Sequence, residues 1–151
     1  MPQTAPPPQV LPITARWCLE APAPASTAKA PCIDLEVAIT PQQQSLGLMA
    51  RPPLPPLRGM WFPYQQPQLL RFWMNHTPAP LDMLFLNQGR VIAIDAAALP
   101  CPHLPCRSYG PDQAADGVVE LAAGQAAALG IKVGSAATIV PIRPPQAGAG
   151  R

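Results

Sequence analysis

The chain has 151 residues, of which 48% are hydrophobic and 12% charged, and its formal net charge is +2. That length and apolar content are sufficient for one domain with a hydrophobic core. The basic residues are scattered singly, which argues against nucleic acid as a partner, and the apolar runs are shorter than the roughly 20 residues that span a bilayer.

Proline is concentrated at the start of the chain, where the first 31 residues hold eight of the 24 prolines and no glycine. Such a composition is typical of an extended linker. We predict an N-terminal tether over residues 1–31, one globular domain over 32–142 and a flexible tail over 143–151. The start lacks the basic and apolar regions of a secretory signal, so we expect either the mature form of an exported protein or a cytoplasmic one.

The first predicted elements are a strand over 33–39, which alternates apolar and polar residues, and a short helix over 41–46. Thr40 and Gln43 can form a capping box, Pro41 suits the first helical position, and Leu46 and Met49 should face the core. The stretch "RPPLPPLR" (51–58) must be a loop, after which we expect Gly59 to allow a sharp turn.

Further strands are predicted over 70–75, 81–86, 90–95 and 117–121, with a hairpin at "NQG" and Gly89 at positive φ. The strand over 90–95 is apolar on both faces, so we expect both to be covered. A short helix within 123–131, capped by Gly130, and a closing strand complete the chain. Because the connections look too brief for βαβ crossovers, we predict an α+β, mostly β domain: an antiparallel sheet or a small, partly closed barrel with two short helices.

The stretch "RFWMNHTPAPLDMLFL" (71–86) sets polar side chains beside the largest hydrophobes. Asn75, Thr77 and Asp82 either bond backbone groups at a bend between two buried strands, the interpretation that we favour, or line a pocket beside Trp61 and Trp73. His76 with Asp82 would be the acid and base of an enzyme. Thr77 and Ser45 are the hydroxyl groups that a hydrolase could use, but no nucleophile elbow accompanies them.

The four cysteines allow three complete pairings, and neighbour pairing joins Cys18 to Cys32 and Cys101 to Cys106. We favour two disulfides, formed in the oxidising compartment of an exported protein, over free thiols. A zinc site of Cys101, His103 and Cys106 with His76 is the weaker alternative, because a second ligand pair is missing nearby. Without a Cys-x-x-Cys motif, thiol exchange is disfavoured.

Arginines and methionines give two more hypotheses. Arg51, Arg58, Arg71 and Arg107 could clamp an anion, although pairing with Asp34, Glu36, Asp82 or Glu120 is the more usual role. The methionines at 49, 60, 74 and 83 could bind copper through their thioethers, but core packing is far more common.

Six blocks in order over about residues 33–139 carry a resemblance: "LEVAITPQQQSLGLMAR", "RGMWF", "FWMNHTPAPLDMLFL", "GRVIAI", "PCPHLPCRSY" and "VVELAAGQAAALGIKVGS". Together they resemble the domain-of-unknown-function 192 family of small bacterial and archaeal proteins. The resemblance implies a compact β-rich domain, often exported, and no established reaction. Members commonly carry a basic residue where Asn75 stands and an Asn where His76 stands, and many carry an acid where Ser135 stands.

We therefore expect an exported, periplasmic or extracellular accessory domain that acts as a monomer, binds a small anionic or saccharide ligand and uses no metal or cofactor. The predicted ligand surface lies between the 51–62 loop and the 75–82 corner. Its residues are Arg58, Trp61, Trp73, Asn75, His76 and Asp82. The competing hypothesis is a hydrolase or carbohydrate-active enzyme that uses Asp82 and His76.

Overall fold

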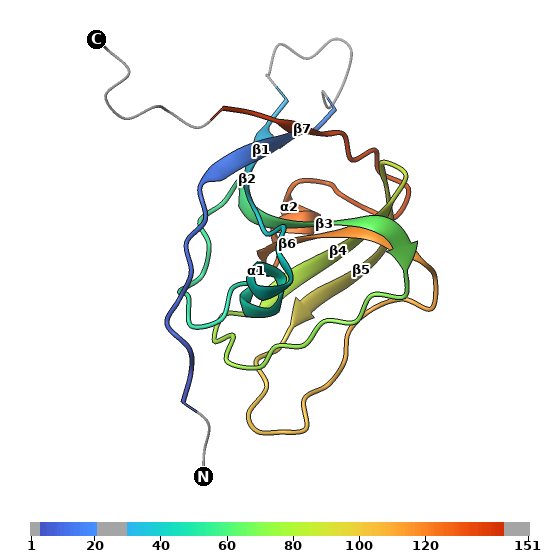
Figure 1. The fold of residues 1–151 in the computed structure, drawn as a ribbon. Coiled ribbons are helices and arrows are strands. Elements are labelled where there is room, and N and C mark those ends of the chain that lie inside the picture. The colour runs from blue at the N-terminus through green and yellow to red at the C-terminus, as the bar shows by residue number, and fades with distance from the viewer. Residues whose placement is uncertain (1–3, 21–29, 144–151) are drawn as a thin grey trace, which may run out of the picture.

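Figure 1 shows the fold as a computed structural model, which describes residues 4–20 and 30–143. Within these residues, seven strands form one sheet and two short helices flank it, which confirms the predicted mostly-β class. The strands are β1 (Ile13–Cys18), β2 (Cys32–Val37), β3 (Arg58–Gln68), β4 (Leu81–Asn87), β5 (Arg90–Ala98), β6 (Ala115–Ala122) and β7 (Ile139–Pro141). The helices are α1 (Pro41–Leu46) and α2 (Gln125–Ala128).

The strand order is β5-β4-β6-β3-β2-β1-β7, so the sheet has two edges and does not close into a barrel. Neighbouring strands are antiparallel except β2 and β3, which are parallel. The connection between these two strands, residues 38–57, contains α1 and is therefore long enough for a crossover. The expectation that no connection could support a parallel pair was wrong.

The start of the domain also differs from the prediction. Residues 13–18 were expected in the tether, but they form β1, which pairs with β2 on one side and β7 on the other. Trp17 on this strand is fully buried, so the segment contributes to the core. Residues 1–3 and 21–29 of the predicted tether and 144–151 of the predicted tail lie outside the described residues.

The predicted capping box of α1 is confirmed. The Thr40 hydroxyl accepts from the Gln43 amide at 3.1 Å, and the Gln43 side chain accepts from the Thr40 amide at 3.1 Å. The core residue of this region is Leu48, whereas Leu46 and Met49 are half-buried, because the chain turns at Gly47 with φ of 47° and brings the next side chain inward.

The hairpin between β4 and β5 is confirmed, with φ of 50° at Gln88 and 74° at Gly89. The covering predicted for both faces of the 90–95 strand is partly met: Ile92 packs against one buried cluster, and Val91 and Ile94 against the other, although Ile92 and Ile94 stay half-buried. Gly59 also differs from its expected role. It lies inside β3, and a Cβ there would come within 2.8 Å of the Glu120 carbonyl oxygen, so it permits a close approach of strands rather than a turn.

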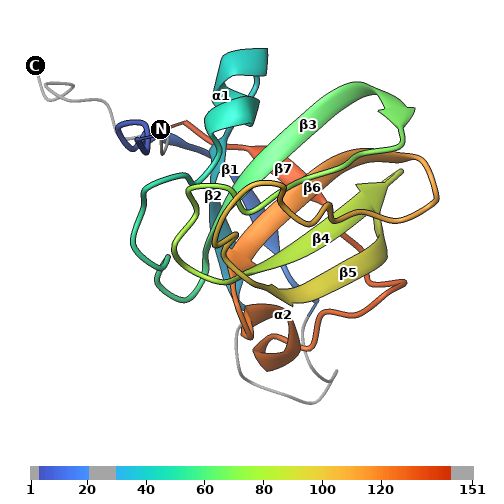
Figure 2. The same cartoon turned by 90° about the horizontal axis from the view of Figure 1, so that it is seen from below.

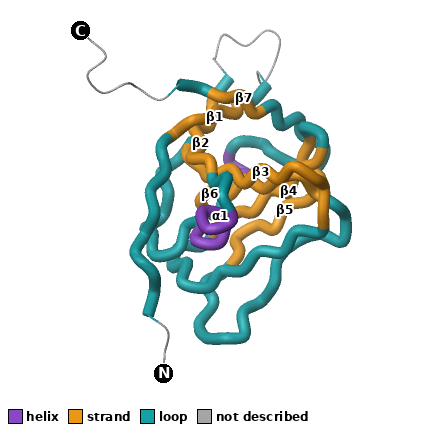
Figure 3. Tube along the Cα trace, in the orientation of Figure 1, coloured by secondary structure: helices purple, strands orange, loops and turns teal. Residues whose placement is uncertain are grey.

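The predicted strand over 70–75 is not formed, and Figure 3 draws the chain between β3 and β4 as loop. One isolated bridge joins Phe72 to Tyr109, with hydrogen bonds of 2.9 and 2.8 Å. In the direction of residue 111 the ladder cannot extend, because Pro111 has no amide hydrogen.

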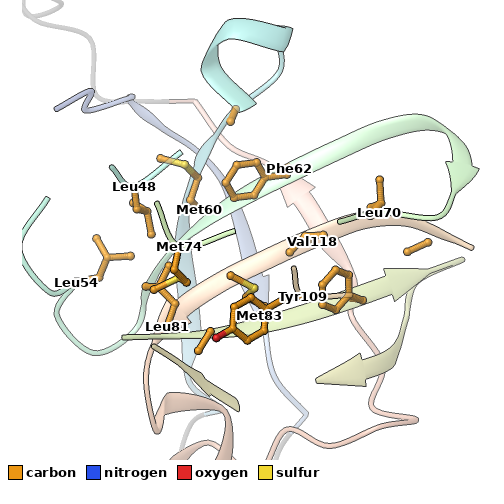
Figure 4. Packing of buried hydrophobic residues seen from close by; sticks show 14 residues of the cluster. Leu48, Leu54, Met60, Phe62, Leu70, Met74, Leu81, Met83, Tyr109 and Val118 are labelled. Atoms are coloured by element: carbon orange, nitrogen blue, oxygen red, sulfur yellow. The ribbon is translucent and has the colours of Figure 1, made fainter. Parts of the chain in front are cut away.

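Two buried clusters fill the opposite faces of the sheet, and Figure 2 shows α1 and α2 on these two sides. The cluster near α1 includes Leu48, Met60, Phe62, Met74, Met83, Phe85 and Val118 (Figure 4). The cluster near α2 includes Trp17, Ile33, Leu35, Leu84, Val119, Leu121 and Ala126. Three of the four methionines considered for copper thus pack in the core, and Met49 is half-buried beside it.

All four cysteines form the predicted neighbour pairs, Cys18–Cys32 and Cys101–Cys106. The first joins directly opposed residues of β1 and β2, and the second closes the proline-rich loop after β5. Two disulfides are compatible with an oxidising, exported location. In the described part of the chain, no helix is long and apolar enough to cross a membrane.

Candidate functional site

Asp82 lies on β4 and is only 1% exposed. Its Oδ1 accepts from the Ala97 amide at 2.9 Å, and its Oδ2 accepts from the Gly124 and Ala126 amides at 3.0 Å each. The carboxylate therefore ties the end of β5 and the start of α2 to the start of β4. This is the structural role that we favoured, although the donors are amides and not an arginine.

Of the other corner side chains, Thr77 also bonds a backbone group, whereas within the described residues the Asn75 and His76 side chains make no hydrogen bond. The Thr77 hydroxyl donates to the Asn75 carbonyl at 3.1 Å, and the His76 carbonyl accepts from the Ala50 amide at 2.7 Å. His76 adopts φ of 54° and lines a hollow of about 710 Å³ that Asn75, Cys101 and His103 also line.

The structure does not bring His76 and Asp82 together. The Asp82 carboxylate is enclosed by three amides near α2, whereas His76 lines the hollow beside the 101–106 loop. The geometry therefore does not support an acid–base pair. The zinc alternative also loses its thiolates, since Cys101 and Cys106 are joined. Among the described residues, no group of three His, Cys, Asp or Glu side chains is placed to hold a metal.

The four arginines do not converge on an anion site. Arg51 makes a two-pronged ion pair with buried Glu36 at 2.7 and 2.9 Å, as the pairing interpretation predicted. Arg71 bonds Asp112 at 3.0 Å, and the guanidinium carbon of Arg107 lies 4.8 Å from the centre of the Tyr109 ring. Arg58 begins β3, with its Nε atom buried.

The two predicted tryptophans lie in different places. Trp61 packs over Gly117 so closely that a Cβ there would come within 2.1 Å of the indole ring. Trp73 is 48% exposed and lines a hollow beside α1. The six predicted ligand residues thus lie in separate environments. Of these six, Trp73 is the one that lines the hollow beside α1.

This α1 hollow, of about 340 Å³, lies between α1 with the turn that follows it and the 71–73 segment. Its lining includes Gln44, Ser45, Leu48, Phe62, Tyr64, Arg71, Phe72, Trp73 and Glu120. The rings of Phe62 and Phe72 meet edge to face, with centroids 5.0 Å apart. The hollow therefore combines a rigid aromatic wall with one acidic side chain.

Glu120 is the acidic side chain of the α1 hollow. It lies in the middle of β6, between Met60 of β3 and Met83 of β4, and is 4% exposed. Among residues 4–20 and 30–143, no side-chain hydrogen bond or ion pair engages its carboxyl group. Burial alone raises the pKa of Glu120 from 4.5 to about 8, so the group is mostly a neutral acid at pH 7.

Tyr64 is affected by the same environment. Burial raises the pKa of its hydroxyl above 10.0, and the charge of Glu120 raises it further. Perturbed acids of this kind in a lined hollow are typical of binding or catalytic sites. The sequence reasoning considered Glu120 only as a partner for an arginine. The signal that could have identified it is that "GVVEL" sets one acid inside a continuous apolar run.

Comparison with known proteins agrees with this fold. The model of the DUF192 family, described as "Uncharacterized ACR", matches residues 23–139. A protein of Sinorhizobium meliloti 1021, described as a candidate transcription regulator, is 28% identical, with a TM-score of 0.72 over 88% of this chain and 97% of that one. A protein of unknown function from Novosphingobium aromaticivorans DSM 12444 is 29% identical, with a TM-score of 0.69 over 88% and 93% of the two chains. No curated protein matches the chain.

Proposed function

Since the chain belongs to the domain-of-unknown-function 192 family, whose members are described as uncharacterized, we propose from the geometry of its site that it is an exported ligand-binding domain without a catalytic step. The ligand enters the α1 hollow. Two disulfides support the exported location, because such bonds persist in oxidising compartments.

The observation that carries this proposal is the position of Glu120, which is 4% exposed, lines the hollow and is engaged by no donor among the described side chains. Burial disfavours the charged form of this group, which is why its pKa is raised to about 8. Other buried acids of this protein are satisfied, Asp82 by amides and Glu36 by Arg51. A bound molecule that supplies the missing partner would offset the cost at Glu120.

The larger hollow near His76 is a weaker candidate. Prolines and a disulfide cysteine supply much of its lining, its two histidines are exposed or half-buried, and its buried polar side chain, Asn75, carries no charge. The transcription role in the description of the Sinorhizobium protein is not carried over to this chain. Three arginines of the described residues are engaged in ion pairs, and the remaining basic residues are scattered. They therefore form no continuous positive surface for the phosphates of a nucleic acid.

The test is a fragment and metabolite screen followed by amide chemical-shift mapping on isotope-labelled protein. It includes sugars, peptidoglycan fragments and divalent metal ions. We expect binders to shift the signals of Ser45, Gly47 and the Trp73 indole. Shifts confined to the 101–104 loop, or no binder at millimolar concentration, would contradict the proposal.

A blocking variant sharpens this experiment. Ser45→Trp places a large ring in the lining of the α1 hollow and should abolish binding. Gln42→Trp is the matched control, because Gln42 is exposed on the same helix but is not part of the lining. Equal binding to both variants would show that the ligand uses another surface.

A further inference from the structure

We propose that the occupant of the α1 hollow presents an organic ammonium group to Glu120 and an apolar body to the surrounding rings. This inference rests on the proposed function and names the chemical class of its ligand. It follows from three properties of the lining: its aromatic side chains, its hydrogen-bond acceptors, and its charge.

The aromatic side chains of the hollow suit a cation. Phe62, Tyr64, Phe72 and Trp73 all line it, and an ammonium group is attracted to the faces of such rings, most strongly to Trp and Tyr. The Phe62 ring is held by its edge-to-face contact with Phe72, so this wall is already in place without a ligand. Preorganised rings lose little freedom when a ligand binds.

The polar side chains of the hollow offer acceptors that an ammonium group can use. The Gln44 amide nitrogen already donates to the Ala38 and Pro63 carbonyls at 3.1 and 2.9 Å, which leaves its oxygen to accept. The Ser45 and Tyr64 hydroxyls can accept as well as donate, and the Glu120 carboxyl accepts through both oxygens once it is ionised. These acceptors match the N–H groups of a ligand, and an ammonium brings up to three of them.

The charges near Glu120 also favour a positive ligand. Arg71 is the cation of the lining, but its guanidinium donates to the Leu70 and Pro111 carbonyls at 2.9 and 2.6 Å and pairs with Asp112. Glu36 lies in the same cross-strand row beyond Met60, where the Arg51 ion pair balances its charge. Glu120 is thus the acid in the lining without a cationic partner.

Binding moves one proton. In the empty hollow the Glu120 carboxyl is protonated below about pH 8, and an ammonium ligand favours the carboxylate. The carboxyl proton then passes to solvent, while the ligand keeps its own protons. Affinity for the cation should therefore rise as the pH rises toward 8 and become constant above it, until the amine itself loses its charge.

The test uses two probes of the same size, phenethylamine, which is a cation below pH 9, and the neutral 2-phenylethanol. Dissociation constants are measured from amide shifts at pH 6 and pH 8. We expect the amine to bind the α1 hollow at least tenfold more tightly at pH 8 than at pH 6. The alcohol should bind more weakly than the amine at pH 8 and should gain nothing from the rise in pH.

Two variants isolate the carboxyl group. Glu120→Gln keeps the shape of the side chain and should weaken amine binding at pH 8 at least tenfold while leaving the alcohol within about twofold. Asp95→Asn removes a negative charge from β5, outside the lining, and should leave both probes within about twofold. The pH comparison on the unmodified protein needs no variant, so a misfolded Glu120→Gln protein would not prevent the test.

The ways in which the experiment can fail are distinguishable. If the alcohol binds the hollow as tightly as the amine at both pH values, the ammonium proposal is overturned and the binding function stands. The ammonium proposal is likewise overturned if other fragments of the screen occupy the hollow and the amine does not. If nothing occupies the hollow, both proposals fail.

Discussion

The surroundings of Asp82 and Glu120 are the most informative comparison in this protein. Both carboxyl groups are buried on neighbouring strands, Asp82 on the α2 side of the sheet and Glu120 on the α1 side. Asp82 accepts hydrogen bonds from three backbone amides, whereas no described side chain donates a hydrogen bond to Glu120. A buried acid is therefore not in itself a sign of function. The partners that it has, or lacks, decide between scaffold and site.

A third buried carboxylate extends the comparison and gives the largest expected effect. Glu36 is held by Arg51 and by the Leu11 amide at 2.8 Å. Arg51→Met would leave this charge buried with one donor, so we expect a loss of about 3–5 kcal/mol in the free energy of unfolding by urea. Arg16→Met is the control, because its ion pair with Asp34 is exposed and should be worth less than about 1 kcal/mol. Equal losses in the two variants would contradict this account.

The next effect concerns Asp82. Asp82→Asn replaces an acceptor oxygen by an NH₂ group that faces amide donors, so we expect a loss of about 1–3 kcal/mol and a melting temperature lower by several degrees. Asp116→Asn should change less, since Asp116 accepts from one exposed amide, that of Gln88. An unchanged melting temperature for Asp82→Asn would contradict the conclusion that Asp82 stabilises the fold.

Unlike Asp82→Asn, Glu120→Gln should raise the stability of the protein as the pH rises. The folded pKa of about 8 lies above the unfolded value of 4.5, so the folded state binds the proton more tightly. The stability linked to this group is complete below about pH 4.5 and is lost as the pH rises through 8. Relative to the unmodified protein, the variant should therefore gain on the order of 1 kcal/mol per pH unit within that window. Parallel pH profiles of unfolding free energy for the two proteins would contradict this.

Trp73 should give the smallest effect on stability. Its side chain is 48% exposed, so Trp73→Ala should change the free energy of unfolding by less than about 0.5 kcal/mol. The same change should lower the affinity of the α1 hollow for any ligand, because it removes one of the aromatic side chains of the lining. A large loss of stability without a loss of binding would assign Trp73 to the core.

Local chemistry made part of this structure predictable. The capping box of α1, the turn at Gly89 and the neighbour disulfides each depend on residues close together in sequence. The role of Asp82 followed from a general rule about buried acceptors. Strand β1 was missed because the prolines around it suggested a linker, while its pairing with β2 and β7 depends on distant residues.

Most of the candidate site could not be predicted from the sequence. Its lining comes from α1, β3, β6 and the 71–73 segment, which packing of the whole domain brings together. Trp73 was selected for its size and surroundings in sequence. Glu120 was not, because the apolar run around it indicates that the acid is buried but not whether it meets an arginine or faces a hollow.

The central claim is that Glu120 is buried without a partner, and the most direct test is its own titration. Carbon-13 NMR of labelled carboxyl groups, with the Glu120 signal assigned from Glu120→Gln, follows its ionisation in the ligand-free protein. We predict a midpoint near pH 8. A midpoint near 4.5, the ordinary value for this side chain, would show that water or a neighbouring group already satisfies it, and the case for the α1 hollow as a binding site would end there.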